Sequence, residues 1–255
     1  MRIIGVELDI AWESRQTNYD AVRRALDRAQ PPKESLIVLP EMFATGFSMN
    51  AGMTAELAGG ETEAFLSGMA KTYESFLIAG TVTKGTSGRG RNEALLFDTQ
   101  GREVFRYCKR HPFSYAEEDK YYEAGHDIVI TPLNGFMVVP FICYDLRFPE
   151  DFRSAVRKGA NCFVVIANWP EARAMHWTTL LKARAIENQA YIVGVNRRGT
   201  DPKNRYSGLS VVIDPLGNVI AEAGAADGLL LADIEVDTVV AVRRQFPFLA
   251  DMRND

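Results

Sequence analysis

The chain has 255 residues, of which 47% are hydrophobic and 24% are charged, and its formal net charge is −4 at pH 7. This composition is typical of a folded globular protein with one sizeable α/β domain or two small ones. Because the charge balance is slightly acidic, the chain has no excess of basic residues that could bind a polyanion. We therefore expect neither a nucleic acid nor an anionic membrane as a partner.

Cysteine usage and the N-terminal segment indicate a reducing compartment. The three cysteines, Cys108, Cys143 and Cys162, form no CxxC pair, which argues against a disulfide framework and a thiolate zinc site. The apolar N-terminal run is too short and too acidic for a signal peptide, and no run approaches the roughly 20 apolar residues of a membrane span. We expect a cytoplasmic protein.

Apolar runs rich in β-branched residues predict strands along the whole chain. These runs cover residues 2–8, 35–39, 76–83, 93–98, 104–109, 136–142, 162–167, 191–196, 208–213, 218–222 and 229–234. Apolar residues at helical spacing predict helices over 18–29, 61–73 and 176–190, and another helix is expected to open at 147–149.

The connections between these elements indicate the fold class. DTQGR (98–102) and DPLGN (214–218) are typical of hairpin turns, in which glycine supplies a positive φ. Strand–helix alternation combined with hairpins predicts mixed sheets covered by helices. Because no linker-like tract separates two composition regimes, we expect a single domain built on two packed sheets.

The segment VVPFICYDLRFPE (138–150) contains the strongest candidate nucleophile. An apolar strand ends at Cys143, and a helix is expected to follow directly. Backbone N–H groups at such a strand-to-helix junction are unpaired and available to a group bound over the thiol, which suits acyl chemistry. The alternative is an ordinary buried cysteine, because free cysteines are among the most buried residues.

Two further strands end in ionisable residues. IVLPEMFATGF (37–47) places Glu41 after a strand among apolar neighbours, where desolvation is expected to raise its pKa, unless it is a solvated loop residue. VFRYCKRHPF (104–113) delivers Lys109 to a strand end, where it could equally protect a sheet edge. The acidic segment AEEDKYYEAG (116–125) follows and could be a solvated turn.

Together, Glu41 in PEMF, Lys109 in YCKRHPF and Cys143 in FICYDLRFPE resemble the Glu–Lys–Cys triad of the nitrilase, or carbon–nitrogen hydrolase, superfamily. The resemblance covers essentially the whole chain, including 167–199 and 206–224. It implies an α/β fold, a four-layer α-β-β-α sandwich of two mixed sheets, as one domain over 1–255. It also implies a homo-oligomer. Glu118 matches the family's supporting second glutamate, with the adjacent Glu117 as its rival.

This resemblance assigns roles in amide hydrolysis. Glu41 is the expected general base for the Cys143 thiol, which would form a thioester with the substrate. Lys109 and the backbone N–H of Tyr144 would stabilise the oxyanion, and Glu118 would hold Lys109 in place. Because the sequence shows no metal site and no phosphate-cradling loop, we expect no cofactor and no metal.

Four residues are candidates for substrate binding. Phe43 and Trp169 are expected to form pocket walls, although Trp169 could cap the core instead. Arg147, one helical turn after the nucleophile, would anchor a substrate carboxylate or pair with Glu150 or Glu187. His111 would shape the pocket, unless it is a structural histidine.

Within the superfamily, PEMFATGFSMN, CYDLRFPE and ANWP are most similar to the ω-amidase branch. This similarity implies a small-molecule amide substrate, 2-oxoglutaramate or 2-oxosuccinamate, and release of ammonia. Simple amidases, carbamoylases and true nitrilases remain open. An acyltransferase with the same nucleophile and a catalytically inactive oligomeric binding protein are the alternatives of other kinds.

Overall fold

Two mixed β-sheets packed face to face form the centre of the computed structural model, which describes residues 1–253. The first sheet has, in spatial order, β15 (Leu229–Asp233), β1 (Arg2–Val6), β2 (Leu36–Val38), β3 (Phe76–Lys84), β4 (Gly90–Phe97) and β5 (Glu103–Cys108), and the short β6 (Tyr122–Glu123) pairs with β4. Strands β1, β2 and β3 are parallel, whereas β15, β4 and β5 run antiparallel to their neighbours.

The second sheet repeats this plan of parallel strands at the centre and antiparallel strands at the edges. Its order is β14 (Val219–Glu222), β13 (Val211–Ile213), β10 (Tyr191–Asn196), β9 (Cys162–Ala167), β8 (Phe136–Ile142) and β7 (Thr131–Leu133). Strands β8, β9 and β10 are parallel. A separate two-stranded hairpin consists of β11 (Arg198–Thr200) and β12 (Arg205–Ser207).

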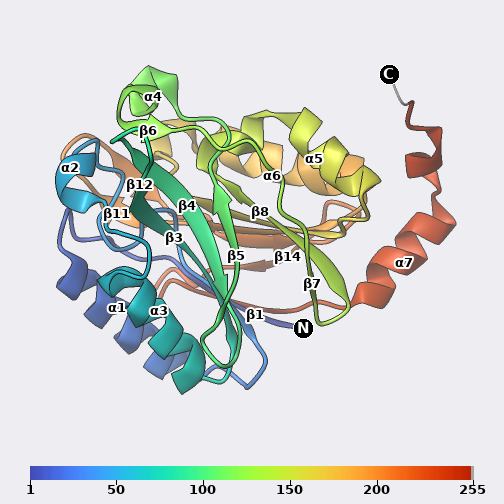
Figure 1. Cartoon of the computed structure of the whole chain (residues 1–255). Coiled ribbons are helices and arrows are strands. Elements are labelled where there is room, and N and C mark those ends of the chain that lie inside the picture. Colours follow the sequence, from blue (N-terminus) through green and yellow to red (C-terminus); the bar gives the residue numbers. More distant parts are fainter. Residues whose placement is uncertain (254–255) are drawn as a thin grey trace.

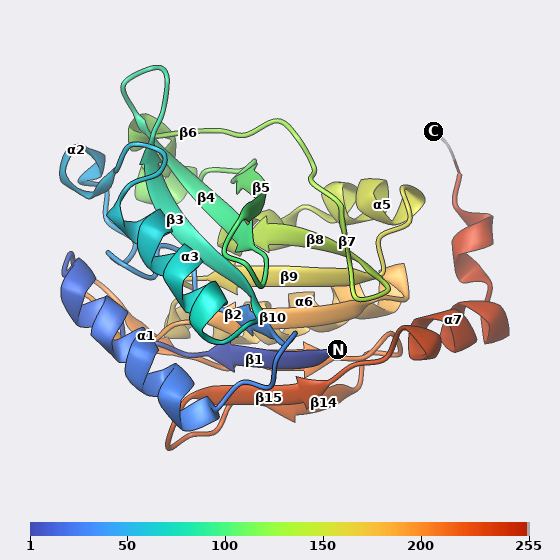
Figure 2. The same cartoon turned by 60° about the horizontal axis from the view of Figure 1, so that its bottom comes forward.

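Helices cover the outer faces of both sheets (Figures 1 and 2). The first sheet is covered by α1 (Arg15–Ala29) and α3 (Glu61–Thr72), and the second by α5 (Pro149–Arg157) and α6 (Ala174–Asn188). The remaining helices are α2 (Ala51–Thr54), α4 (Glu118–Tyr121) and α7 (Val236–Gln245), together with the 3₁₀ turns η1 (Ser114–Ala116), η2 (Cys143–Arg147), η3 (Glu171–Arg173) and η4 (Phe248–Asp251). The predicted α-β-β-α sandwich is therefore confirmed.

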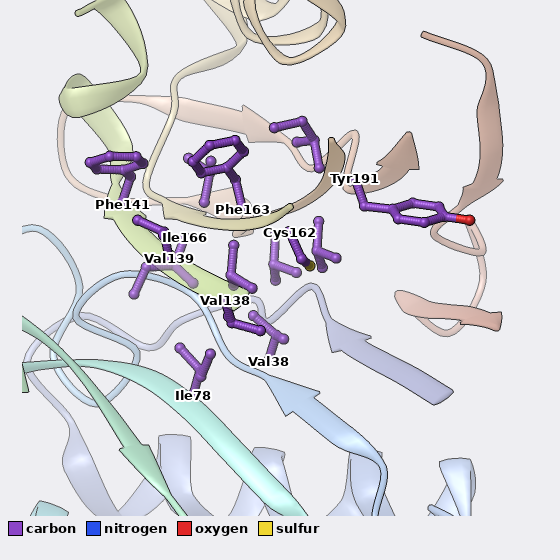
Figure 3. Packing of buried hydrophobic residues seen from close by; sticks show 14 of the residues in the cluster. Val38, Ile78, Val138, Val139, Phe141, Cys162, Phe163, Ile166 and Tyr191 are labelled. Carbon is purple, nitrogen blue, oxygen red and sulfur yellow. The ribbon is translucent and has the colours of Figure 1, made fainter. Parts of the chain in front are cut away.

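Alternation along the strands builds the two cores, because successive side chains of a strand point to opposite faces. Ile37 of β2 faces the helices α1 and α3, while Val38 faces the second sheet. Figure 3 shows Val38 and Ile78 of the first sheet opposite Val138 and Val139 of the second. Ile37 and these four residues are all fully buried. Because the four that lie between the sheets are apolar, the interior between the sheets is apolar.

The predicted strands over 136–142, 162–167 and 191–196 are confirmed residue for residue, and both predicted hairpin turns connect antiparallel strands. The helix α7 was not predicted, because its apolar positions are valines, whose branched side chains disfavour helix formation. The hairpin β11–β12 also escaped prediction, since its short strands carry charged and polar residues.

Candidate active site

Residues that lie just beyond the ends of strands of both sheets meet at one edge of the sandwich. Glu41 lies three residues beyond β2, Lys109 follows β5, Cys143 follows β8 and Asn168 follows β9. Since β2, β3 and β5 run in the same direction, and β8 and β9 are parallel, these residues all lie at carboxyl strand ends. The carboxyl ends of strands are where ligands bind in open α/β sheets.

The Glu41 carboxylate is completely buried, and both of its oxygens accept hydrogen bonds. Oε1 accepts from Lys109 Nζ at 2.9 Å and from Asn92 Nδ2 at 2.7 Å. Oε2 accepts from the backbone N–H of Asn168 at 2.8 Å. The side chain of Asn168 also donates to the main-chain oxygen of Glu41 at 2.7 Å, so the carboxylate is fixed in position.

Glu118 completes this buried cluster from the short helix α4. Its Oε2 accepts from Lys109 Nζ at 2.9 Å and from the backbone N–H of Phe113 at 2.6 Å, and its Oε1 accepts from Asn92 Nδ2 at 2.9 Å. Glu117, the rival candidate, is instead exposed and contacts Lys120. The lysine therefore lies between Glu41 and Glu118.

The electrostatics of the cluster correct one expectation. Burial alone would raise the pKa of Glu41, but the Lys109 ammonium and the hydrogen bonds from Asn92 and Asn168 outweigh burial and lower this pKa below its ordinary value. Conversely, burial would lower the pKa of Lys109, but the carboxylates of Glu118 and Glu41 raise it well above the ordinary value. Both groups are therefore charged near neutral pH.

Cys143 begins the 3₁₀ turn η2 with a φ of +49°, a left-handed conformation that is uncommon for residues other than glycine. Its half-buried thiol lies with Sγ 3.9 Å from the main-chain oxygen of Asn168. Burial, reinforced by the Glu41 carboxylate, raises the pKa of the thiol well above its ordinary value. Cys143 is thus a neutral thiol at rest and needs a base before it can act as a nucleophile.

Asp145 fixes the turn that carries the thiol. Its carboxylate is completely buried and accepts from the backbone N–H groups of Ile142 and His111, both at 3.0 Å, and from the Tyr107 hydroxyl at 2.7 Å. Burial raises its pKa to about 6. These contacts join the Cys143 turn to the segment that follows Lys109.

A pocket of about 320 Å³ opens over Cys143. Aromatic and cationic side chains dominate its lining, which comprises Trp12, Phe47, Met49, Phe113, Tyr115, Ala116, Cys143, Tyr144, Arg147, Asn168, Trp169, Pro170, Arg173, Asp201, Pro202, Lys203, Asn204 and Tyr206. The predicted substrate residues Arg147 and Trp169 are in this set, as is Tyr144.

Arg147 lies with its guanidinium 4.8 Å from the centre of the Trp169 ring, and its Nη2 is 3.2 Å from Nδ1 of His176. The alternative ion pair with Glu187 is not formed, because Glu187 contacts Arg184 at 3.0 Å. In the described residues Glu150 contacts no cation either. The charge of Arg147 is therefore available to a substrate.

Two predicted substrate residues lie elsewhere. Phe43 is fully buried in the core beneath α1 and α3, where its ring centre is 6.1 Å from those of Tyr19 and Phe65. The ring of His111 stacks on that of Phe148, with the ring centres 3.6 Å apart, and its Nε2 lies 2.8 Å from Oδ2 of Asp151. Neither lines the pocket, so both predictions of substrate contact are wrong, and His111 has the structural role that was its alternative.

Three contributors were not predicted: Asn92, Asn168 and Asp145. Asn92 is an inward-facing polar residue within the apolar strand β4, and Asn168 directly follows the apolar strand β9. A buried polar residue in an apolar run needs a hydrogen-bonding partner, so these positions did carry a signal. The described residues include no cluster of His, Cys, Asp and Glu able to hold a metal ion. None of the helices described is long and apolar enough to cross a membrane.

Comparisons with known proteins identify the family of the chain. The family model described as carbon-nitrogen hydrolase matches residues 3–244. The chain is 33% identical to a 2-oxoglutaramate amidase of Bacillus subtilis and 39% identical to the omega-amidase YafV of Escherichia coli, each match covering 98% of this chain and 96% of the relative.

A solved structure shows the same similarity in three dimensions. XC1258 from Xanthomonas campestris, a CN-hydrolase superfamily protein with an arsenic adduct in its active site, superposes with a TM-score of 0.93 at 31% identity, covering 100% of this chain and 98% of that one. Family model, relatives and fold therefore agree: the chain belongs to the carbon-nitrogen hydrolase family.

Proposed function

We propose that this protein is an ω-amidase that releases ammonia from 2-oxoglutaramate or 2-oxosuccinamate through a thioester on Cys143. The observation that carries the proposal is the buried Glu41–Lys109–Glu118 cluster next to a thiol at the base of a pocket lined by Arg147. The similarity to relatives named 2-oxoglutaramate amidase and omega-amidase supports the choice of substrate.

Catalysis begins at the neutral thiol of Cys143. Glu41 accepts the thiol proton as Sγ attacks the amide carbonyl carbon, and the oxygen of that carbonyl becomes an oxyanion. Lys109 Nζ and the backbone N–H of Tyr144 donate to this oxyanion, and each donor is worth on the order of 3 kcal/mol when preorganised.

Collapse of the tetrahedral intermediate breaks the carbon–nitrogen bond. Glu41 returns its proton to the nitrogen, which leaves as ammonia, and the acyl group remains on Sγ as a thioester. Glu41 then removes a proton from a water molecule that attacks the thioester, so the carboxylic acid leaves and the thiol is restored. Glu118 keeps Lys109 in place through both half-reactions.

Substrate selection rests on Arg147. A 2-oxo acid amide carries a carboxylate at the end opposite to its amide, and a guanidinium binds a carboxylate through two parallel hydrogen bonds. The Trp169 ring supports the guanidinium from one side, and apart from the contact of Nη2 with His176 its N–H groups can donate to a substrate carboxylate.

A substrate panel tests this function. The purified protein is incubated with 2-oxoglutaramate, 2-oxosuccinamate, a simple aliphatic amide, a nitrile and an N-carbamoyl amino acid, and ammonia is measured. The proposal expects the two oxo acid amides to be turned over fastest. Efficient turnover of only the nitrile or the N-carbamoyl amino acid would reject it, and formation of a substituted amide on addition of an amine would indicate an acyltransferase.

We further propose that residues 1–255 form one domain, of which residues 254 and 255 lie outside the described part, and that the protein is a cytoplasmic homo-oligomer. Exposed apolar side chains on α6 and in the C-terminal segment, namely Ile186, Val240 and Phe248, support an interface between subunits. Light scattering on the eluting protein measures the oligomer, and a monomeric mass at micromolar concentration would contradict it.

A further inference from the structure

Asn92 lies at the centre of the buried charge cluster although it carries no charge itself. It is only 1% exposed and belongs to β4, the strand between β3 and β5. The next residues on the same face of this strand, Ala94 and Leu96, are part of the apolar core between the sheets. A buried amide at the end of such an apolar row is destabilising unless it is hydrogen-bonded.

The side-chain nitrogen of Asn92 joins the two carboxylates of the cluster. Nδ2 donates to Oε1 of Glu41 at 2.7 Å and to Oε1 of Glu118 at 2.9 Å. An amide nitrogen carries two hydrogens, so each carboxylate receives one of them. The contacts also fix the orientation of the amide, because an oxygen in the place of Nδ2 would face two carboxylate oxygens.

The main chain of Asn92 holds the third member of the cluster. Its carbonyl oxygen accepts a hydrogen bond from the backbone N–H of Lys109 at 2.8 Å. The Nζ atom of Lys109 lies 2.9 Å from Oε1 of Glu41 and 2.9 Å from Oε2 of Glu118. One residue of β4 therefore contacts all three charged residues.

These contacts make the two carboxylate oxygens of Glu41 unequal. Oε1 accepts hydrogen bonds from both Asn92 and Lys109, which occupy its lone pairs. Oε2 accepts from the backbone N–H of Asn168 at 2.8 Å, and its contact with Nδ2 of the same residue is longer, at 3.3 Å. The main-chain oxygen of Asn168 also lies 3.9 Å from Sγ of Cys143. Oε2 is therefore the oxygen that can take up a proton, and it shares a neighbour with the thiol.

The oxygen of the Asn92 side chain contributes nothing comparable. Among residues 1–253 no group donates to Oδ1, although this atom is buried. A buried acceptor without a partner destabilises a fold. The hydrogen bonds of the Asn92 side chain are thus directed solely to the two acids.

We propose that Asn92 is a positioning residue for the general base: it occupies Oε1 of Glu41, ties this carboxylate to Glu118 and leaves Oε2 to exchange the proton. This inference rests on the proposed function, in which Glu41 is the base. Oε2 takes the proton of the Cys143 thiol and gives it to the departing nitrogen. It then takes a proton from water and returns it to the sulfur, so the carboxylate is restored after each half-reaction.

The pH dependence of the reaction reports on this arrangement. The groups that carry charge or titrate around Glu41 are Lys109, Glu118, Cys143 and Tyr122. Burial raises the pKa of Glu41, and the Lys109 ammonium, with the hydrogen bonds from Asn92 and Asn168, outweighs burial. Loss of the Asn92 donor should therefore raise this pKa. Because the base must be ionised, the acidic limb of kcat/KM should move to higher pH.

Two substitutions that keep the branched shape of the side chain test the inference. Asn92→Leu removes both N–H groups, and Asn92→Asp replaces them with a third carboxylate. We expect kcat at pH 7 to fall by about 10- to 100-fold in Asn92→Leu, as loss of hydrogen bonds to a charged group predicts. KM should change by less than about threefold, because Asn92 does not line the pocket.

The pH profile of kcat/KM separates positioning of the base from a purely structural role. Its acidic limb should lie at higher pH in Asn92→Leu than in the wild type. It should lie at still higher pH in Asn92→Asp, because a like charge raises the pKa of Glu41 further. A loss of packing would not order the two variants by charge. If Asn92→Leu fails to fold, the limb of Asn92→Asp tests the same direction of shift.

Asn188→Leu is the matched control. Asn188 is fully buried at the end of α6, donates through Nδ2 to the main-chain oxygen of Arg184 at 2.9 Å and, within residues 1–253, also has an Oδ1 without a donor. Its substitution should lower the urea concentration at the midpoint of unfolding and leave kcat and the pH profile unchanged. An unshifted acidic limb in folded Asn92→Leu or Asn92→Asp would overturn the inference, as would the same shift in Asn188→Leu.

The choice of substrate keeps this test separate from that of the proposed function. The profiles are measured with 2-oxoglutaramate. If the wild type releases no ammonia from it, the proposed function fails. The amide of the substrate panel that is turned over fastest then serves for the profiles, and the outcomes for Asn92 keep their meaning.

Discussion

The buried charge cluster and the rim of the pocket, only a few side chains apart, are built on opposite principles. In the cluster, Glu41, Lys109 and Glu118 are at most 1% exposed, and every charge contacts an opposite one. At the rim, Arg147 and Lys203 are partly or largely exposed, and among residues 1–253 neither forms an ion pair. Because buried charges must be paired and exposed ones need not be, the two regions differ in what they tolerate.

This difference separates chemistry from selectivity. A cluster in which one buried ammonium contacts both carboxylates keeps fixed protonation states and fixed positions, which catalysis of one reaction requires. Unpaired cations at an open rim can be exchanged without leaving a buried charge unpaired, so they can change with the substrate. Substitutions in the cluster should therefore lower turnover of every substrate, and substitutions at the rim only that of anionic ones.

The largest effect is expected at the nucleophile. Cys143→Ala should lower ammonia release from 2-oxoglutaramate by at least about 10⁴-fold, because the thioester can no longer form. The matched control is Cys108→Ala, whose half-buried thiol lies outside the pocket and should be dispensable. Substantial activity in the Cys143 variant would place the nucleophile elsewhere.

The second largest effect is expected when Lys109, the cation at the centre of the cluster, is replaced. Lys109→Met leaves two carboxylates buried without a counter-charge, which should lower the free energy of unfolding by about 3–5 kcal/mol. In the wild type the lowered pKa of Glu41 means that its carboxylate stabilises the fold above its ordinary pKa, and this contribution is lost as the pH falls through the lowered value.

In Lys109→Met the ammonium that lowers the pKa of Glu41 is missing, so this pKa should rise. The acidic limb of the stability and activity profiles should therefore move to higher pH. Urea unfolding and kcat/KM between pH 4 and pH 8, about the range in which carboxylates with raised pKa values titrate, measure both profiles. Lys84→Met, at an exposed end of β3, is the control and should change stability by less than about 0.5 kcal/mol. An unshifted acidic limb in Lys109→Met would contradict the ion pair.

Substitutions at the rim should affect some substrates and not others. Arg147→Gln should lower kcat/KM for 2-oxoglutaramate by about 10- to 100-fold, the range expected for loss of hydrogen bonds to a charged group. Turnover of pentanamide, which lacks a carboxylate, should change by less than about twofold, since the lost interaction is absent there. Equal losses for the two amides would show that Arg147 supports the turn instead of binding the substrate.

The smallest effect is expected at Phe43, which was first assigned to the pocket. Phe43→Leu should lower stability by less than about 1.5 kcal/mol, as a volume-conserving core substitution does, and should leave KM unchanged. Trp169→Leu is the matched change in a residue that does line the pocket, and it should raise KM. A similar rise of KM in both variants would restore Phe43 to the site.

The triad could be predicted from the sequence because the motifs around Glu41, Lys109 and Cys143 together resemble those of a known family. The position of each residue after an apolar strand is compatible with that resemblance, but by itself it left an ordinary structural role open for all three. The direction of the Glu41 pKa shift could not be predicted in the same way. It depends on Asn92 and Asn168, which are far from Glu41 in the sequence and reach it only in the folded chain.

The wrong and missing assignments around the pocket have identifiable structural causes. Phe43 follows Met42, whose φ of +44° breaks the strand alternation, so its ring turns into the core beneath the helices. His111 was misassigned because its partner, Asp151, lies on α5 and could not be inferred from the local sequence. Arg173 and Lys203 were missed since a cation in a polar loop is ordinarily solvated, and only the fold shows that both line one pocket.

The central claim is that the acyl group of the substrate is carried by Cys143. Rapid mixing of the wild-type protein with 2-oxoglutaramate, acid quenching within one turnover and mass spectrometry of the peptide that contains Cys143 test it most directly. We predict an added acyl mass on that peptide that forms and decays at rates compatible with kcat, and its absence in Cys143→Ala. Full turnover without any acylated peptide, or with the acyl group on Cys108 or Cys162, would contradict the account.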